Sequence, residues 1–177
     1  ETAYQSAVAY AQDRRQGRAL TGAKEPDQPA DSLIVHPDVR RMLLTMRAFS
    51  EGARALAYWI GMQLDISEKH PDTEKRQAAD DLVALMTPII KAHFTDEGFN
   101  NAHLGIHCMG GPGYIKEWGM EQLLRDARIT LLYEGANGVQ ALDLVGRKLP
   151  AHFGRLLRRY FHPAMAFIEE HHADREI

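Results

Sequence analysis

The sequence has little cysteine and no long apolar run. Cys108 is the single cysteine among 177 residues, so an intramolecular disulfide framework of the kind found in small secreted proteins is excluded. No stretch approaches the roughly 18 consecutive apolar residues that a membrane-spanning helix needs. The start shows no basic region followed by an apolar core, as a signal peptide would. We therefore expect a cytoplasmic protein that has no membrane partner.

Charge of one sign is not in excess either. The 21 Lys and Arg residues nearly balance the 24 Asp and Glu residues, giving a formal charge of -3 and a pI near 6.3. This balance is not the electrostatic footprint of a nucleic-acid-binding protein. Arg155, Arg158 and Arg159 form the one basic cluster of note, and their spacing predicts a solvated helix face.

Helical periodicity, in contrast, runs through nearly the whole chain. The chain begins at Glu1, without a methionine and directly in a helical pattern, so we expect a piece of a longer protein. The apolar spacing predicts helices over residues 2–18, 37–68, 73–108, 118–129, 137–149 and 150–173. No stretch alternates as a strand would. The predicted fold is all-α: an up-down four-helix bundle over residues 1–149, with an additional helical segment over residues 150–177.

Proline and glycine mark the expected breaks. Residues 21–32 contain Gly22, Pro26 and Pro29 and no periodic apolar residue, which indicates a connecting loop. Asp72 or Thr73 can cap the helix that follows. Pro88 inside that helix should kink it or remove one backbone hydrogen bond.

Glu134 is the strongest candidate for chemistry. It follows Leu131, Leu132 and Tyr133 and precedes Gly135, so a carboxylate lies beside apolar side chains. Desolvation raises the pKa of a carboxyl group toward neutrality, which suits a base that removes a proton from a weak carbon acid. Glu-Gly-Ala-Asn-Gly is equally a good turn sequence, so a solvated loop glutamate is the alternative.

Metal and thiol sites are weaker candidates. His103 and His107 are four residues apart, and Glu169 with His172 forms one Glu-x-x-His pair, whereas carboxylate-bridged di-iron bundles need two such pairs and two further glutamates. Surface histidines are therefore the preferred interpretation, and no metal is predicted. Nothing near Cys108 supplies a base, so a buried thiol is favoured over a nucleophile.

Several segments, in this order along the chain, resemble the C-terminal helical domain of the acyl-CoA dehydrogenases. One of them, residues 36–43, resembles the larger branch of this family, which includes the methylthiopropionyl-CoA dehydrogenases and some long-chain enzymes. The segments are Tyr10-Ala11-Gln12-Asp13-Arg14-Arg15-Gln16-Gly17, His36-Pro37-Asp38-Val39-Arg40-Arg41-Met42-Leu43, Cys108-Met109-Gly110-Gly111-Pro112-Gly113-Tyr114, Arg125-Asp126-Ala127-Arg128-Ile129 and Tyr133-Glu134-Gly135-Ala136-Asn137-Gly138-Val139-Gln140.

The resemblance implies a fragment of an enzyme that also has an N-terminal helical domain and a central β-barrel. It implies oxidation of an acyl-CoA to the 2,3-enoyl-CoA with FAD as acceptor. Glu134 would take the α-proton while the β-hydride goes to flavin N5, and Gly135 would contact the acyl-CoA. The residues implied to bind FAD are Arg14, Gln16, His107, Cys108, Met109, Gly110, Gly111, Ala136, Asn137 and Gly138.

The sequence departs from the family pattern at three of these places. Ala136 replaces a common threonine, His107 replaces a common glutamine, and no phenylalanine precedes Gly17. The implied partners are electron-transfer flavoprotein and further copies of the chain, in a dimer or tetramer. An alternative from another class is that the 177 residues form a helical assembly module without catalysis, which would bind FAD weakly or not at all.

Overall fold

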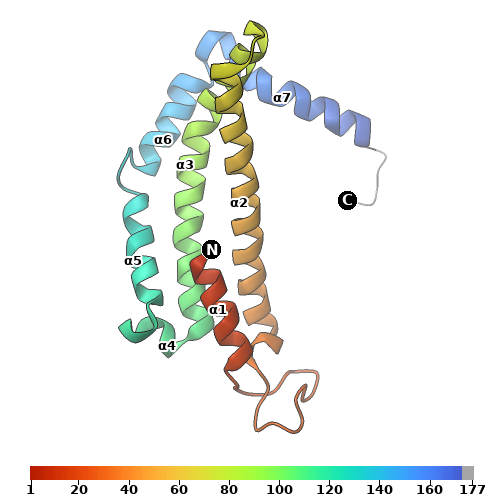
Figure 1. The fold of residues 1–177 in the computed structure, drawn as a ribbon, viewed down its shortest axis with the longest axis vertical. Coiled ribbons are helices and arrows are strands. Elements are labelled where there is room, and N and C mark those ends of the chain that lie inside the picture. The colour runs from red at the N-terminus through yellow and green to blue at the C-terminus, as the bar shows by residue number, and fades with distance from the viewer. Residues whose placement is uncertain (173–177) are drawn as a thin grey trace. The chain divides into compact units, whose positions relative to one another are not determined.

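The computed structural model describes residues 1–172, and all regular elements in that range are helices (Figure 1). A lone antiparallel bridge between Arg15 and Ser32 is the nearest approach to a strand there. The predicted all-α bundle with an additional C-terminal helix is confirmed. No described helix combines the length and the apolar character that crossing a membrane would require.

The helices divide between two compact units, one of residues 1–54 and 94–134 and one of residues 55–93 and 135–177. The two longest helices, α2 and α3, contribute a segment to each unit. In chain order the elements are α1 (Thr2–Asp13), η1 (Leu33–Val35), α2 (Pro37–Lys69), α3 (Thr73–Met109), α4 (Gly111–Tyr114), η2 (Lys116–Trp118), α5 (Met120–Thr130), α6 (Asn137–Asp143), η3 (Leu144–Lys148) and α7 (Ala151–His171).

The core of the first unit is built from small residues on α1 and methionines on its neighbours. Ala3, Ala7 and Ala11 recur every four residues, so they share one helix face, and all three are buried. Met46 of α2 and Met120 of α5 are fully buried in the same cluster. The alanine face lets α1 approach its neighbours closely, and the flexible methionine side chains fill the space that remains.

The first helix ends earlier than predicted. The expected range of 2–18 is wrong, because α1 stops at Asp13 and Arg14 adopts extended backbone angles (φ -69°, ψ 126°). Residues 14–16 instead pair with the chain near Ser32. Residues 21–32 form a connecting loop as predicted, and several of its backbone groups are hydrogen-bonded.

The boundary between α2 and α3 follows its sequence signals. Asp72 caps α3 by accepting hydrogen bonds from the backbone N–H groups of Glu74 (2.8 Å) and Lys75 (3.4 Å). These bonds lower the pKa of Asp72, because they stabilise the ionised carboxylate. The helix continues through the buried Pro88 without a break in its assignment.

The later helices also differ in detail from their predicted ranges. A short 3-10 turn, η2, precedes α5, and α6 passes into the π-helical stretch η3 before Pro150. The backbone of α7 is left-handed at His152, Phe153 and Gly154, so its regular part begins at Arg155. The last residue of the predicted helix, Ala173, lies outside the described residues.

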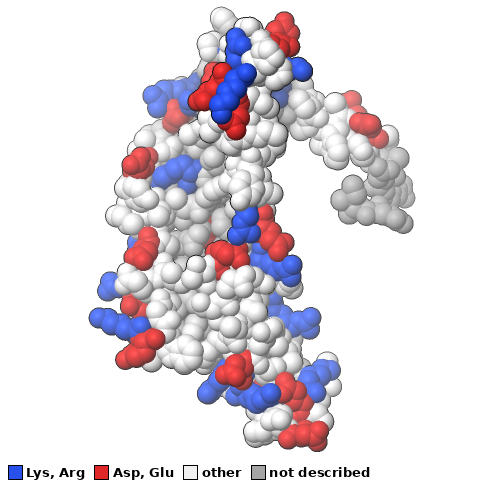
Figure 2. Space-filling model, viewed as in Figure 1, with Lys and Arg blue, Asp and Glu red and all other residues white. Residues whose placement is uncertain are grey.

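Charged side chains are mixed over the surface. On the face drawn in Figure 2, Lys and Arg are interspersed with Asp and Glu, and neither sign gathers into one extended patch. Several of the contacts are helical pairs three or four residues apart, such as Arg41 with Asp38 and Arg47 with Glu51. Such exposed pairs contribute little to stability, because water and salt screen the attraction between the charges.

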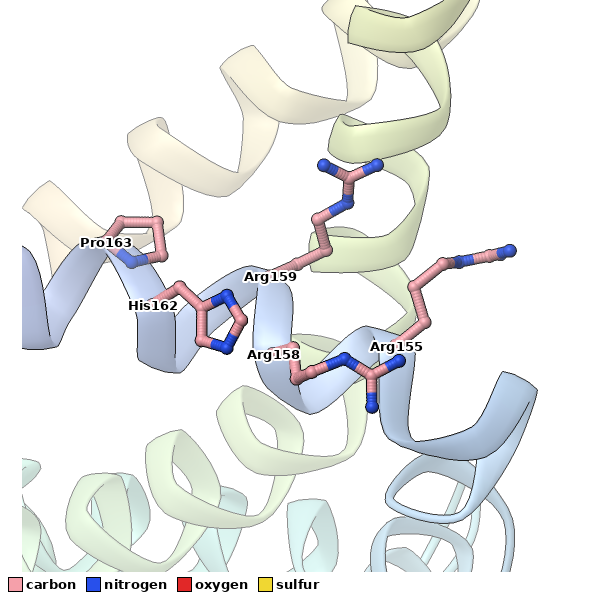
Figure 3. Close-up of a pocket in the computed structure, with 5 residues that line it drawn as sticks. All are labelled: Arg155, Arg158, Arg159, His162 and Pro163. Carbon is pink, nitrogen blue, oxygen red and sulfur yellow. The ribbon is translucent and has the colours of Figure 1, made fainter.

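One ion pair in the second unit differs from these because its carboxylate is buried. Asp81 of α3 is 2% exposed, and Arg155 of α7 donates to both of its oxygens at 2.9 Å. Arg159 also lies 3.5 Å from Asp81, and both arginine side chains extend toward α3 in Figure 3. The prediction of a solvated arginine face is therefore wrong for Arg155, which is half-buried, and holds for Arg158 and Arg159, which are exposed.

The three arginines, with His162 and Pro163, border a recess of about 280 Å³ on α7. Arg158 donates to the carbonyl of Phe153 and so closes the irregular first turn of the helix. The arrangement makes Asp81 the anchor of α7 on α3, with Arg155 as the bidentate partner. A bidentate pair of this geometry is stronger than a single charged contact.

Replacing Arg155 by methionine should therefore destabilise the second unit by about 2–3 kcal/mol, because it leaves a buried carboxylate with weaker partners only: Arg159 at 3.5 Å and the amide of Gln77 at 3.2 Å. The matched variant Arg158→Met, which loses a bond to a backbone carbonyl only, should cost less than about 1 kcal/mol. Urea denaturation followed by circular dichroism measures both. Equal losses in the two variants would contradict the anchoring role of Asp81.

Candidate functional site

The segment around Glu134 is an irregular loop between two helices. After α5 ends, the backbone N–H groups of Leu132 and Tyr133 donate to the carbonyl of Ile129 at 3.0 and 3.2 Å. Helix α6 begins after Ala136, which has extended backbone angles (φ -53°, ψ 155°). The boundary between the two compact units falls between Glu134 and Gly135, so the geometry of each side is described separately.

Glu134 has an unusual backbone conformation. Its φ is 58°, in the left-handed region that L residues other than Gly, Asn and Asp seldom adopt. Within residues 1–172, His152 and Phe153 are the other non-glycine residues with positive φ, and both belong to the first turn of α7. Such a conformation costs on the order of 1–3 kcal/mol and is frequent at functional sites.

Glu134 is exposed in this chain. The apolar residues next to it, Leu132 and Tyr133, are 53% and 50% exposed. These residues alone therefore do not supply the dry environment expected from the sequence. Exposed apolar side chains beside a carboxylate are typical of a surface that another part of a protein covers.

On the other side of the boundary, the start of α6 is tightly held. Asn137 accepts a hydrogen bond from Lys91 Nζ at 2.8 Å and donates to the carbonyl of Ala92 at 3.3 Å, which attaches α6 to α3. Gly135 has φ 84°, and a Cβ there would lie 2.8 Å from Gln140 Nε2, which donates to its carbonyl. The positive φ favours glycine at position 135, and any larger residue would also displace the Gln140 side chain.

Arg14 and Gln16 lie next to each other on an extended segment. Their side chains are exposed, whereas Arg15 between them is half-buried. Side chains alternate between the two faces of an extended chain, so Arg14 and Gln16 share a face and Arg15 points the other way, where it forms an ion pair with Glu25.

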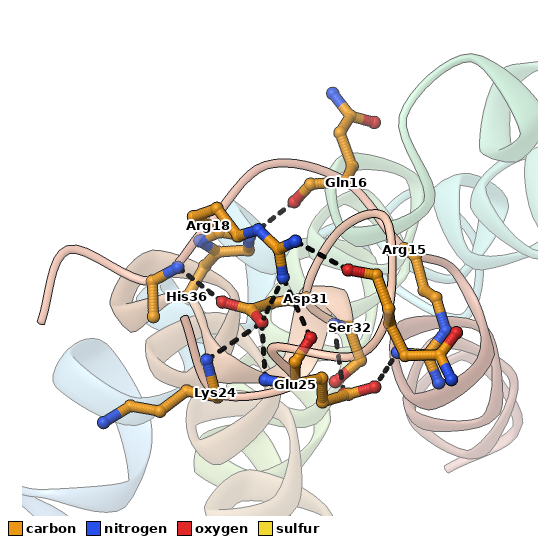
Figure 4. Close-up of polar contacts among 10 residues, drawn as sticks. Arg15, Gln16, Arg18, Lys24, Glu25, Asp31, Ser32 and His36 are labelled. Atoms are coloured by element: carbon orange, nitrogen blue, oxygen red, sulfur yellow. Dashed lines mark hydrogen bonds and ion pairs between the residues drawn. The ribbon is translucent and has the colours of Figure 1, made fainter. Parts of the chain in front are cut away.

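A buried carboxylate that sequence analysis did not single out organises the loop beside these residues (Figure 4). Asp31 is fully buried and accepts hydrogen bonds from the N–H groups of Ala19 (2.8 Å), Lys24 (3.0 Å) and Glu25 (2.8 Å). Arg18 adds a contact of 3.2 Å. The bond from Ala19 is the main reason that the pKa of Asp31 is lowered. Nothing in the sequence distinguishes Asp31 from the other acidic residues of this loop, because its partners are backbone groups.

The third group of predicted residues lies at the end of α3. Cys108 and Met109 are buried, 3% and 4% exposed, and belong to the core of the first unit. Their side chains face inward, so a ligand outside the chain could meet only their backbone. His107, Gly110 and Gly111 are exposed, and a Cβ at either glycine would meet no atom within 4 Å.

The histidines do not gather into a larger cluster. The rings of His103 and His107 lie 4.4 Å apart, edge to face, and His107 Nδ1 donates to the carbonyl of His103 at 3.2 Å. His172 Nδ1 likewise donates to the backbone carbonyl of Glu169. Over residues 1–172, no three potential metal ligands of the His, Cys, Asp or Glu type lie together.

Comparison with known families settles the class of protein. The family model of the acyl-CoA dehydrogenase C-terminal domain matches residues 1–149. The chain belongs to the acyl-CoA dehydrogenase family. The resemblance seen in the motifs is therefore confirmed, and the irregular loop at Glu134 and the segment at Arg14 both lie inside the matched region.

Similar proteins include bacterial enzymes. The chain is 45% identical over 160 residues to the 3-methylmercaptopropionyl-CoA dehydrogenase of Ruegeria pomeroyi, covering 90% of this chain and 26% of that protein. It is 34% identical over 159 residues to a butyryl-CoA dehydrogenase of Syntrophomonas wolfei, with the same two coverages. The chain thus spans about a quarter of the length of these relatives.

The fold also has a solved counterpart. The crystal structure of Caenorhabditis elegans ACDH-11 in complex with C11-CoA matches 99% of this chain and 27% of its own, with a TM-score of 0.77. The apo form of Bd2924 matches with a TM-score of 0.74. The sequence identity is 22%, so this likeness concerns the fold. The ACDH-11 match includes α7, which the family model does not cover.

The residues at the end of α1 and at the end of α3 suit a flavin dinucleotide to different extents. Arg14 and Gln16 offer exposed donors on one face, which is appropriate for phosphate oxygens. The open backbone at Gly110 and Gly111 allows close approach from outside. At Cys108 and Met109 the fit is limited to backbone groups, because the side chains fill the core.

Burial raises the pKa of the Cys108 thiol to about 11, because the thiolate would lose its hydration. The unfolded chain ionises at lower pH, so the folded state binds more protons between about pH 9 and 11 and stability falls as pH rises through that range. We expect Cys108 to contribute about 1–3 kcal/mol to this loss. Urea denaturation at pH 8 and pH 10.5 should show a smaller difference in Cys108→Ala than in the parent. Identical pH dependence in both proteins would contradict the burial of the thiol.

Proposed function

We propose that this chain is the C-terminal domain of an FAD-dependent acyl-CoA dehydrogenase that converts an acyl-CoA into its 2,3-enoyl-CoA. The family membership supports the reaction class, and the names of the relatives support an acyl-CoA thioester as the substrate. Because the chain covers about a quarter of those relatives, the activity belongs to the complete enzyme. Residues 1–149 are proposed as the family domain, and residues 150–177 as an added helical segment.

Glu134 is proposed as the base that removes the α-proton of the substrate. The observation that carries this assignment is its strained backbone (φ 58°) in an exposed loop of the family domain, beside a glycine that also has a positive φ (84°). A strained conformation is retained where the direction of a side chain matters. FAD, when bound, accepts the hydride from the β-carbon.

A carboxylate is a strong enough base for this step only in a dry site where the thioester carbonyl is polarised. The exposed apolar side chains of Leu132 and Tyr133 are available to pack against the rest of the enzyme and the acyl chain. We propose that this packing removes water from Glu134 in the complete protein. The backbone of Gly135 would contact the acyl-CoA.

Arg14 and Gln16 are proposed to bind the diphosphate of FAD, and the backbone of residues 107–111 to approach the FAD of a neighbouring subunit. Ala136, Asn137 and Gly138 would line the flavin. Because Asn137 uses its side chain to hold α6 on α3, its flavin contact would come from the backbone. Electron-transfer flavoprotein and a dimer or tetramer of the same chain are the proposed partners.

Replacing Glu134 by glutamine in the full-length enzyme should lower acyl-CoA oxidation at least about 100-fold, because a neutral amide cannot accept the α-proton. The assay follows reduction of an artificial electron acceptor with FAD in excess. Glu117→Gln, the same change at another exposed glutamate, should retain the parental rate. A Glu134→Gln enzyme as active as its parent would remove the base assignment.

A second variant separates catalysis from backbone strain. Glu134→Gly removes the carboxylate together with the cost of a positive φ, so it should be as inactive as Glu134→Gln without loss of thermal stability. If the activities of the two variants instead rose and fell with their thermal stabilities, the role of Glu134 would be structural.

The alternative function is that of a helical assembly module. The exposed apolar residues Leu142 (73%), Val145 (65%) and Phe153 (97%) support an interface in the second unit. If the 177 residues act only in this way, the isolated chain should purify without flavin. Flavin absorbance that co-elutes with the isolated chain would argue for a cofactor site complete within it.

A further inference from the structure

The chain from Arg14 to Leu33 is a closed loop whose two ends are joined by backbone hydrogen bonds. Gln16 donates to the carbonyl of Asp31 and Asp31 donates to the carbonyl of Gly17, both at 2.9 Å. Leu33 donates to the carbonyl of Arg14 at 2.8 Å. Compact loops with adjoining ends are frequently functional. This one begins with the two side chains proposed to bind a diphosphate.

The buried carboxylate of Asp31 is the centre around which the loop is hydrogen-bonded. The carboxylate gathers the three backbone N–H groups described above, and the guanidinium of Arg18 that approaches it also donates to the carbonyls of Glu25 (3.0 Å) and Gln28 (2.6 Å). These contacts satisfy polar backbone groups that a loop of this length would otherwise expose or bury unpaired. The conformation of the loop is therefore specified by contacts within the chain.

His36 holds the opposite side of the same segment. From its position just before α2, His36 Nε2 donates to the carbonyl of Gln16 at 2.8 Å. A Cβ at Gly17 would lie only 3.6 Å from His36 Cε1, so the ring also packs against the backbone there. Both backbone polar groups of Gln16 are thus bound, its N–H by Asp31 and its C=O by His36, and its side chain points away from the cluster in Figure 4.

We propose that Asp31 and His36 are positioning residues that preset Arg14 and Gln16 for the diphosphate of the cofactor. This inference rests on the proposed function, because it takes the ligand to be FAD. Neither residue touches the ligand. A binding segment that is ordered beforehand loses less conformational entropy on binding, which is the usual advantage of preorganisation.

The test is a titration of the full-length apoenzyme with FAD, followed by flavin fluorescence. His36→Leu, which removes the donor and keeps an apolar side chain, should raise the Kd for FAD about fivefold to tenfold. His36→Gln, whose amide can again donate to the Gln16 carbonyl, should restore binding to within about twofold. Once FAD is saturating, the KM for acyl-CoA should be the same in all variants.

Asp31→Asn provides the second arm, because an amide nitrogen would face N–H donors that the carboxylate accepts. Its Kd for FAD should rise about tenfold or more, and the amides of residues 14–33 should exchange hydrogen faster in the apoenzyme. Asp81→Asn is the matched control: it neutralises another buried, arginine-paired carboxylate. It should lower thermal stability and leave the Kd for FAD unchanged.

The outcomes are distinguishable. A parent enzyme that binds no FAD, or an Arg14→Leu enzyme that binds it as tightly as the parent, overturns the proposed cofactor contact and the inference with it. If Arg14→Leu weakens binding but His36→Leu and Asp31→Asn do not, the inference alone is overturned. It is also overturned if His36→Gln binds as poorly as His36→Leu. If Asp31→Asn fails to fold, the Kd values for FAD of His36→Leu and His36→Gln decide whether the inference holds.

Discussion

The close packing of α1 is the interaction on which the first unit depends. Ala3, Ala7 and Ala11 present a nearly flat face, and Gly105 of α3 leaves room for Met120, whose Sδ would lie 2.8 Å from a Cβ at position 105. Tight interiors transmit displacement, because a filled core cannot deform continuously. The end of α1, and with it Arg14, therefore has a defined position relative to α2, α3 and α5 within this unit.

After Arg14 the chain leaves α1 and forms a loop that is held by hydrogen bonds and not by apolar packing. The loop beyond Arg14 buries a carboxylate and surrounds it with backbone donors, an arrangement that is stable only when all partners are present. The apolar packing of α1 and the polar packing around Asp31 thus meet at residues 14–17. Two exposed donors emerge at this junction, and both are held by their backbones.

In the second unit, polar contacts attach the helices α6 and α7 to α3. Asn137 ties α6 to α3 through hydrogen bonds, and Asp81 ties α7 to α3 through a bidentate ion pair. Much of the apolar surface of α7 stays exposed, including Phe161 and Phe167. Such a surface suits a chain that spans about a quarter of its relatives and that would be covered in a complete enzyme.

The sequence by itself determined the helical fold, the approximate ends of α2, a cap of α3 at Asp72 or Thr73, and the resemblance to the family. Each of these depends on contacts that are local in the chain or on residues in a set order. Only the tertiary structure decided where α1 ends, how Asp31 and His36 hold Gln16, and that Arg155 pairs with Asp81 instead of with water. These features depend on partners 12 to 74 residues apart in the sequence, and neither periodicity nor composition carries information about contacts at that separation. The φ of 58° at Glu134 could not be predicted either, because the turn sequence permits several conformations.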